Sequence, residues 1–379
     1  MMVIGFVGNL ASLAPPAKRI PPARDRARST RIALFIHHSL HERFSSNTLP
    51  WNGNSVKENK KKFFLFLPNP DTVWYAEDSH YACWRSFMVQ NFNGIIPPVI
   101  TCFDRQGQFD PVRQREIVRF LARHVQGFYP CGTYGSGPLM SAEKRKKVAE
   151  TIIKEKGSTF VIVHVGAATT AEAVELAQHA EAAGADAVGA IPPYYYRYPQ
   201  DALIDHYRAL IKAVRIPVFL YNNPEVSGNP ISPDSLRILA EEGLAGVKDS
   251  AFDLVNLYLY MNKVKKPGFQ FIVGTEAIAQ PALDAGACGV IAGLANVFPE
   301  LLADFYRTWK EGNPQKTATL QLKIVEARAV MKLGPTLTMT YAVLRMRGMD
   351  PGFPRLPWKD ISPDLYARSE KELRGLGLL

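Results

Sequence analysis

The stretch TFVIVHVGAATTAEAVELAQHAEAAGADAVGAI, residues 159–191, contains the pattern that decides the fold. It begins and ends with continuous apolar runs (159–165 and 186–191), which are typical of parallel strands covered on both faces. The segment between them begins at Thr169, and Glu172 three residues later completes a capping box. We therefore predict a strand, a helix and a strand in this order.

The same alternation repeats from residue 95 onward. Six further strands are predicted at 95–101, 127–131, 216–221, 244–248, 269–273 and 288–292. Helical segments, the first over 110–126, separate every pair. Eight such units in about 200 residues match a (β/α)₈ barrel. The alternative fold is a doubly wound open sheet, which usually carries a GxGxxG turn that this sequence lacks. We predict an α/β fold: a TIM barrel over 92–297 and a C-terminal helical region over 298–379, with helices at 298–311 and 314–333.

The first 91 residues differ in character and are predicted to be an irregular, basic N-terminal leader. Residues 1–92 contain 12 Lys+Arg against 6 Asp+Glu, so they hold 6 of the 10 net positive charges. Arg-rich, acid-poor leaders resemble organelle transit peptides. Four prolines, at 15, 16, 21 and 22, would break the amphipathic helix that such a peptide needs. We expect a disordered or poorly packed extension or a wrongly assigned start codon in a cytoplasmic protein, with a mitochondrial transit peptide as the alternative.

Composition excludes several function classes. The chain of 379 residues is 47% hydrophobic and 21% charged, which is ordinary for a soluble globular protein. No apolar run is long enough to span a bilayer. The four cysteines, at 83, 102, 131 and 288, are far apart and form no CxxC pair, which argues against a zinc site or a disulfide scaffold. We predict no metal, no cofactor, no membrane partner and no nucleic-acid partner.

The ends of the predicted strands carry an unusual set of side chains. In barrels of this kind the active site lies at the C-terminal ends of the strands. Lys248 ends the sixth strand, Tyr221 ends the fifth, and a glycine-rich turn, 132–137, follows the second. An arbitrary lysine there is usually solvated or structural, and an arbitrary tyrosine is usually a core aromatic. Their joint position favours imine chemistry, in which a neutral lysine amine attacks the ketone of a 2-oxo acid.

Five motifs carry a resemblance to a known family. GTYGSGPLMSAEKR, PPYYYRYPQ, FLYNNPEVSG, GVKDS and GVIAGLAN occur in this order and resemble the dihydrodipicolinate synthase/N-acetylneuraminate lyase family. These are class I, Schiff-base, pyruvate-type lyases on a (β/α)₈ barrel and are commonly homotetramers. The resemblance covers about residues 94–379. It implies a small 2-oxo acid substrate, an aldehyde partner and a homotetramer or dimer.

The resemblance also implies roles for individual residues. Lys248 is expected to form the Schiff base and Tyr221 to shuttle protons. Thr133 and Tyr134 are expected in the turn that holds the substrate carboxylate. Tyr195 resembles the tyrosine that one subunit lends to the proton relay of its neighbour. The backbone carbonyl of Ile291 is expected to line the pyruvate pocket.

The departures from the family motifs concern the second substrate. The family turn is often Gly-Thr-Thr-Gly-Glu but is Gly-Thr-Tyr-Gly-Ser here, which makes Thr133 the better relay candidate and Tyr134 mainly a backbone donor. Val226 stands where the lysine-pathway synthases have an arginine for the second carboxylate. Glu276, beside Thr275, remains in the loop where sugar-acid lyases bind hydroxyls, and Gly293 replaces a serine or threonine.

We therefore predict a lyase, an aldolase or hydro-lyase, that acts on a 2-oxo acid through Lys248. The favoured activity is an aldolase of the 2-keto-3-deoxy sugar acid or 4-hydroxy-2-oxoglutarate type that releases pyruvate or a relative. The alternatives are 4-hydroxy-tetrahydrodipicolinate (dihydrodipicolinate) synthase and a catalytically silent barrel with a binding role.

Overall fold

The computed structural model describes residues 63–66, 72–76, 85–88 and 91–379. Within the predicted N-terminal leader, three short strands form one sheet in the order β1-β2-β3: β1 (Phe63–Phe66), β2 (Thr72–Ala76) and β3 (Arg85–Met88). The rest of that segment lies outside the described residues, so its predicted irregularity and its possible targeting role stay predictions.

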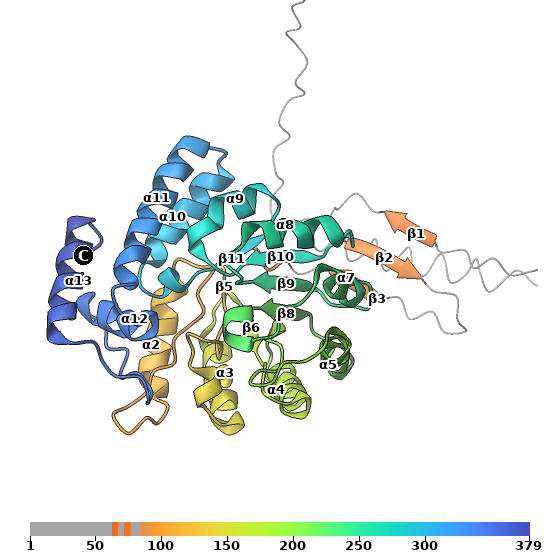
Figure 1. Cartoon of the computed structure of the whole chain (residues 1–379), viewed down its shortest axis with the longest axis horizontal. Coiled ribbons are helices and arrows are strands. Elements are labelled where there is room, and N and C mark those ends of the chain that lie inside the picture. The colour runs from red at the N-terminus through yellow and green to blue at the C-terminus, as the bar shows by residue number, and fades with distance from the viewer. Residues whose placement is uncertain (1–62, 67–71, 77–84, 89–90) are drawn as a thin grey trace, which may run out of the picture. The chain divides into compact units, whose positions relative to one another are not determined.

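Residues 91–379 contain an eight-stranded parallel sheet in the order β4-β11-β10-β9-β8-β7-β6-β5 (Figure 1). The strands are β4 (Gly94–Ile96), β5 (Gly127–Phe128), β6 (Phe160–His164), β7 (Ala187–Ala190), β8 (Val218–Asn222), β9 (Gly246–Asp249), β10 (Gln270–Val273) and β11 (Gly289–Ile291). Between β4 and β5 the backbone N–H groups of Gln126 and Tyr129 donate to the carbonyls of Ile95 and Pro97 at 3.1 and 3.0 Å. These bonds link the two ends of the sheet and confirm the predicted barrel.

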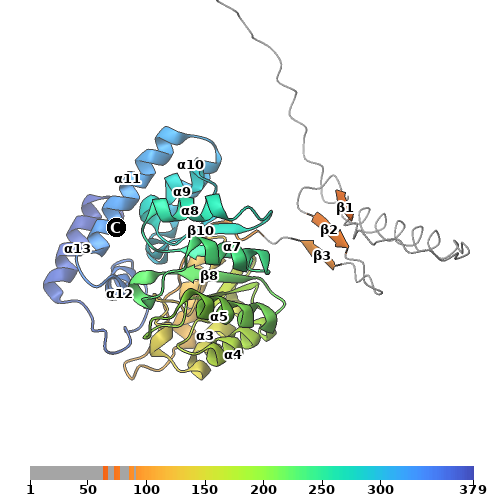
Figure 2. The ribbon, with the colours of Figure 1, turned by 45° about the vertical axis from the view of Figure 1, so that its right-hand side comes forward.

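Helices follow the strands and cover the outside of the barrel (Figures 1 and 2). The α-helices that alternate with or follow the strands are α2 (Pro111–Leu121), α3 (Ala142–Glu155), α4 (Thr170–Ala182), α5 (Gln200–Ala213), α6 (Pro224–Ser227), α7 (Pro233–Glu241), α8 (Leu254–Lys263), α9 (Ala279–Asp284) and α10 (Pro299–Lys310). Within residues 91–379, short 3₁₀ helices lie in the loops: η2 (Gly137–Leu139), η3 (Glu276–Ile278) and η4 (Gly293–Asn296).

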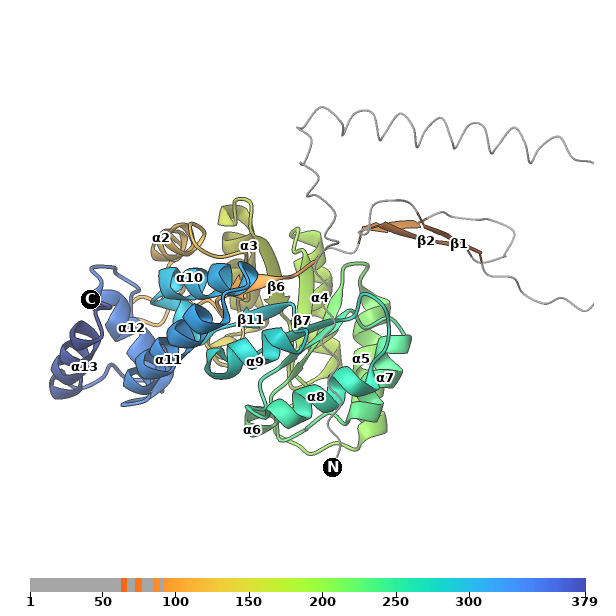
Figure 3. The ribbon, with the colours of Figure 1, turned by 90° about the horizontal axis from the view of Figure 1, so that it is seen from above.

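Three more helices complete the chain: α11 (Pro314–Met331), α12 (Thr336–Met346) and α13 (Pro363–Gly375). Of these, α11 packs against α10, and α12 and α13 pack against α11 (Figure 3). This confirms the predicted C-terminal helices. However, α10 follows β11 and is the eighth helix that alternates with the barrel strands, although it lies in the region 298–379 that we predicted as the C-terminal helical region. No helix of the described residues combines the length and the apolar character that a bilayer span requires.

Local sequence explains where the elements begin and end. The predicted strand 95–101 stops after Ile96 because Pro97 and Pro98 have no N–H to donate to a neighbouring strand. The helix predicted over 110–126 ends at Leu121, ahead of the residues that lead into β5. The predicted N-cap of α4 is present, since the hydroxyl of Thr169 accepts from the N–H of Glu172 at 3.2 Å.

Two apolar layers hold the barrel together. The larger layer lies between strands and helices, and the smaller one fills the interior with side chains that include Phe92, Ile162 and Phe219. Tyr221 on β8 is the register partner of Lys248 on β9. Paired residues of neighbouring strands point to the same face of a sheet. The register therefore places the phenol and the amine side by side at the barrel's C-terminal end.

Candidate active site

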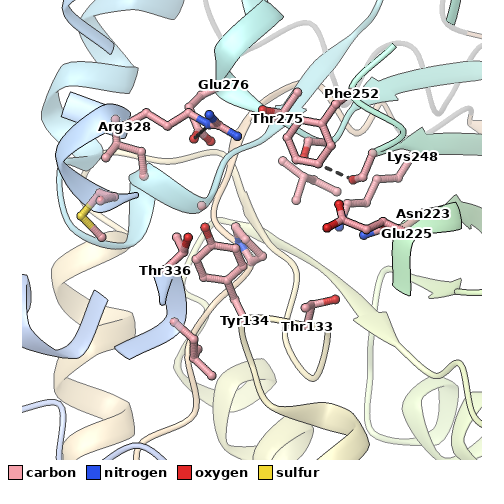
Figure 4. Close-up of a pocket in the computed structure, with 18 of the residues that line it drawn as sticks. Thr133, Tyr134, Asn223, Glu225, Lys248, Phe252, Thr275, Glu276, Arg328 and Thr336 are labelled. Carbon is pink, nitrogen blue, oxygen red and sulfur yellow. Dashed lines mark hydrogen bonds and ion pairs between the residues drawn. The ribbon is translucent and has the colours of Figure 1, made fainter. Parts of the chain in front are cut away.

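A cavity of ≈ 360 Å³ opens at the C-terminal ends of the strands (Figure 4). All the residues predicted for the site except Tyr195 line it: Thr133, Tyr134, Tyr221, Lys248, Glu276, Ile291 and Gly293. They come from the loops and strand ends of β5, β8, β9, β10 and β11. The fold thus brings together segments that are up to 160 residues apart in the sequence.

Lys248 is a buried amine without a carboxylate partner in the described part of the chain. Only 4% of the residue is exposed. Its Nζ lies 3.6 Å from the ring centroid of Tyr221 and 4.3 Å from that of Tyr129. Burial disfavours the charged form and lowers the pKa of Lys248, although the neighbouring phenol of Tyr221 opposes this. A lowered pKa increases the fraction of neutral, nucleophilic amine near neutral pH.

Polar neighbours hold the hydroxyl of Tyr221, whose ring contacts the amine of Lys248. It accepts from Asn223 Nδ2 at 2.9 Å and lies 3.4 Å from the hydroxyl of Thr133. Burial raises the pKa of Tyr221, but the charge of Lys248 and hydrogen bonds from Asn223, Thr133 and Ser250 outweigh it, so that pKa is lowered. Such a phenol can give and take a proton in the cavity.

A second layer of side chains fixes the two tyrosine rings. The ring of His164 lies 5.8 Å from both Tyr129 and Tyr221, centroid to centroid. Burial and the charge of Arg145 lower the pKa of His164, so the ring is neutral. The Arg145 guanidinium donates to the backbone carbonyls of His164 and Gly166 at 2.8 and 3.0 Å. These contacts limit the movement of the rings against which Lys248 packs.

The glycine-rich turn after β5 places Thr133 at the cavity. Its backbone closes on itself, with the N–H of Gly137 donating to the carbonyl of Gly132 at 3.0 Å. A Cβ at Gly137 would lie 1.8 Å from the carbonyl oxygen of Cys131, so this position excludes every other residue. The turn is therefore compact enough for backbone groups to approach a small ligand.

The opposite side of the cavity carries an ion pair. Arg328 Nε lies 3.3 Å from Glu276 Oε1, and only 7% of the glutamate side chain is exposed. The Arg328 guanidinium also lies 5.5 Å from the ring centroid of Phe252. Figure 4 shows this pair across the cavity from Lys248 and Asn223. This side thus holds a pair of opposite charges, whereas the Lys248 amine packs against aromatic rings.

Two predicted features lie away from the cavity. Tyr195 is 87% exposed, has a positive φ of 84°, and contacts Tyr196 with ring centroids 4.9 Å apart. It therefore reaches no group in the cavity of its own chain, and its expected role in a neighbouring subunit stays a prediction. Val226 is 51% exposed and does not line the cavity. The residues from 91 to 379 contain no group of three His, Cys, Asp or Glu side chains placed to hold a metal ion.

Sequence reasoning missed several residues of the site. Asn223 and Ser250 follow strands directly, and their positions beside Tyr221 and Lys248 in the motifs could have revealed them. Arg328, Thr336 and Trp358 come from the C-terminal region and also line the cavity. No spacing in the sequence points to these three, because only the packing of α11, α12 and the loop after α12 brings them to the cavity.

Comparison with known proteins fits this site. A model of the dihydrodipicolinate synthetase family matches residues 91–375. The chain belongs to this family. It is accordingly a lyase of the dihydrodipicolinate synthetase class. The match spans the barrel and the C-terminal helices to the end of α13, and it leaves out residues 1–90.

Individual family members share about a third of their residues with this chain. An uncharacterized DapA-like lyase of Halobacterium salinarum is 36% identical over 290 residues, which are 76% of this chain and 95% of that protein. A probable 2-dehydro-3-deoxy-D-pentonate aldolase, YjhH of Escherichia coli, is 36% identical over 251 residues, 65% of this chain and 83% of the relative. The crystal structure of YagE from E. coli in complex with pyruvate has a TM-score of 0.73 and 26% identity, covering 76% of this chain and 99% of YagE.

Proposed function

We propose that this family member is a class I aldolase that cleaves a hydroxylated 2-oxo acid to pyruvate and an aldehyde through a Schiff base on Lys248. The observation that carries the proposal is the position of the Lys248 amine, buried and 3.6 Å from the ring of Tyr221. A lysine in an apolar wall is costly unless its neutral form is used.

The reaction begins with attack of the neutral amine on the C2 carbonyl. A C–N bond forms, the carbonyl oxygen leaves as water, and the product is a protonated imine. The phenol of Tyr221 gives the proton with which that water leaves and so becomes a phenolate. The phenolate then takes the proton from the hydroxyl on C4, the C3–C4 bond breaks, and the electron pair of that bond moves into the imine. An aldehyde leaves, and the remaining enamine is protonated on C3. Water finally adds to the imine and releases pyruvate and the free amine.

The other predicted residues position the substrate. We assign the substrate carboxylate to the turn of Thr133 and Tyr134, where backbone N–H groups are donors without bulk. The carbonyl of Ile291 faces the pyruvate portion. Thr133 continues the relay from Tyr221, and Tyr195 of a second copy of the chain would extend it. This last role requires a dimer or homotetramer, which its high exposure permits.

The distal half of the cavity favours a sugar acid as the substrate. Glu276 and Thr275 supply polar groups suited to hydroxyls there. The similarity to a probable 2-dehydro-3-deoxy-D-pentonate aldolase supports the same class. A 4-hydroxy-2-oxoglutarate type substrate fits the same chemistry. The lysine-pathway synthase activity is the weaker candidate, because exposed Val226 offers no cation to a second carboxylate.

The test is the intact-protein mass after incubation with pyruvate and borohydride, followed by peptide mapping and an aldehyde panel. We expect a reduced pyruvate adduct on Lys248, and condensation of pyruvate with D-glyceraldehyde or glycolaldehyde. No adduct with pyruvate or with longer 2-oxo acids would refute the aldolase proposal and favour a silent barrel. An adduct together with turnover of aspartate semialdehyde alone would favour the synthase.

A further inference from the structure

Tyr134 and Gly293 share one space in the wall of the cavity. Tyr134 lies in the turn after β5, and Gly293 begins η4 after β11. A Cβ on Gly293 would lie 2.2 Å from the phenol oxygen of Tyr134 and 2.4 Å from its Cζ. Real Cβ contacts are never this short, so the phenol occupies the place of any side chain at position 293. The two departures from the family motifs are therefore one structural feature.

The phenol of Tyr134 faces the cavity without a partner. Among the residues from 91 to 379 it has no hydrogen bond to another side chain or to the backbone. A buried tyrosine hydroxyl usually finds a partner. Burial, followed by the charge of Glu276, raises the pKa of Tyr134, so the hydroxyl stays protonated and can donate. A donor left open toward a cavity suits an acceptor on the ligand.

The phenol of Tyr134 interacts electrostatically with groups at both ends of the cavity. The charges of Glu276 and Arg328 and the phenol of Tyr221 all act on its pKa, so it lies within range of the ion pair and of the proton-transfer tyrosine. Figure 4 shows the ring beside Thr336, on the side of the cavity where Arg328 and Glu276 lie. The carbons of a substrate beyond the imine must pass through this region.

We propose that Tyr134 and Gly293 act as a pair that selects the aldehyde portion of the substrate. The phenol donates a hydrogen bond to a hydroxyl on that portion, and glycine at position 293 leaves the phenol its place. The inference rests on the aldolase function proposed above and deepens it, since it names hydroxylated aldehydes as the class that the cavity selects. It also gives the Tyr134 side chain a role beyond the backbone donor expected from the sequence.

The test compares two acceptors that differ in hydroxyl content. Pyruvate is condensed with D-glyceraldehyde and, separately, with acetaldehyde, which has no hydroxyl group. The variants are Tyr134→Phe, Tyr134→Thr, Gly293→Ala and the double change of Tyr134→Thr with Gly293→Ala. The controls are Tyr258→Phe, an exposed tyrosine of α8 outside the cavity, and Gly375→Ala, where an added Cβ meets nothing within 4 Å.

Tyr134→Phe should lower the ratio of kcat/KM for glyceraldehyde to kcat/KM for acetaldehyde by about 3- to 10-fold, the effect of one hydrogen bond that only the hydroxylated acceptor can lose. Gly293→Ala should lower kcat/KM for both acceptors by at least about tenfold, because the phenol is displaced into the cavity. Gly293→Ala made in the Tyr134→Thr variant should lower kcat/KM by less than about threefold, because threonine leaves free the space that the phenol occupies. This non-additivity marks the two residues as a coupled pair.

The reaction with pyruvate alone separates this inference from the proposed function. If the wild-type protein forms no adduct on Lys248, the aldolase proposal fails, whatever residue 134 does. If the adduct forms in every variant but Tyr134→Phe affects both acceptors equally, the hydroxyl recognition is refuted. If Gly293→Ala lowers kcat/KM by the same factor with tyrosine and with threonine at position 134, the pairing is refuted. Should Tyr134→Phe fail to fold, the comparison of Gly293→Ala in the wild type with Gly293→Ala in Tyr134→Thr still tests the pairing.

Discussion

Replacing Tyr221 by phenylalanine tests the proton-transfer role most directly. The substitution keeps the ring that packs against the amine of Lys248 at 3.6 Å and removes only the hydroxyl. Positioned acid–base groups contribute about 10²–10⁴ in rate, which corresponds to about 3–5 kcal/mol of transition-state stabilisation. We expect kcat for cleavage of 2-keto-3-deoxygluconate to fall within this range, while a pyruvate adduct on Lys248 still forms with borohydride.

The structure also gives the stability cost of Tyr221→Phe. The lost hydroxyl accepts from Asn223 Nδ2 at 2.9 Å, and that buried amide already has an unpaired Oδ1. Leaving one more buried polar atom unpaired should cost about 1–3 kcal/mol of unfolding free energy, measured by urea denaturation.

Tyr207→Phe is the matched control for Tyr221→Phe. The hydroxyl of Tyr207 donates to the carbonyl of Ala190 at 2.8 Å, in the core and away from the cavity. This control should lose a similar amount of stability and keep the wild-type rate. Catalysis by Tyr221→Phe within about threefold of the wild-type rate would refute the assigned role.

Three further changes have defined outcomes. Lys248→Met should abolish turnover and the adduct. Because the folded pKa of Lys248 lies below its ordinary 10.5, wild-type stability falls as pH drops from 10.5 to that lowered pKa, and urea denaturation of the variant should lack this slope. His206 is buried, and burial lowers its pKa from 6.5 to about 4. Stability should therefore fall between pH 6.5 and 4 by about 3 kcal/mol, and His206→Gln should reduce this loss; an unchanged pH profile would contradict it. Arg328→Met leaves the carboxylate of Glu276 unpaired and should cost about 1–3 kcal/mol, less than a fully buried pair. Because Arg328 holds Glu276 at the cavity, the change should also raise KM for glyceraldehyde more than it lowers kcat; an equal loss in both would contradict this.

The sequence by itself determined the order of the elements and led to the two residues that we propose as the reacting ones. Apolar runs such as 159–165 are typical of parallel strands covered on both faces, and the capping residue Thr169 marks a helix start. Lys248 and Tyr221 were found because a polar residue at the end of an apolar strand is a local anomaly. The register pairing of Tyr221 with Lys248 then follows from adjacent parallel strands.

The tertiary structure alone decided which C-terminal residues join Glu276 on the far side of the cavity. Arg328 and Trp358 lie 80 and 110 residues beyond Lys248, and nothing local to them differs from an ordinary helix or loop. The sharing of space by Tyr134 and Gly293 was equally invisible, since the sequence shows two separate departures from a motif. Steric exclusion and ion pairing depend on distances between segments, which the packing of the C-terminal helices and the closure of the barrel determine. Periodicity and capping act over a few residues and contain no information about those distances.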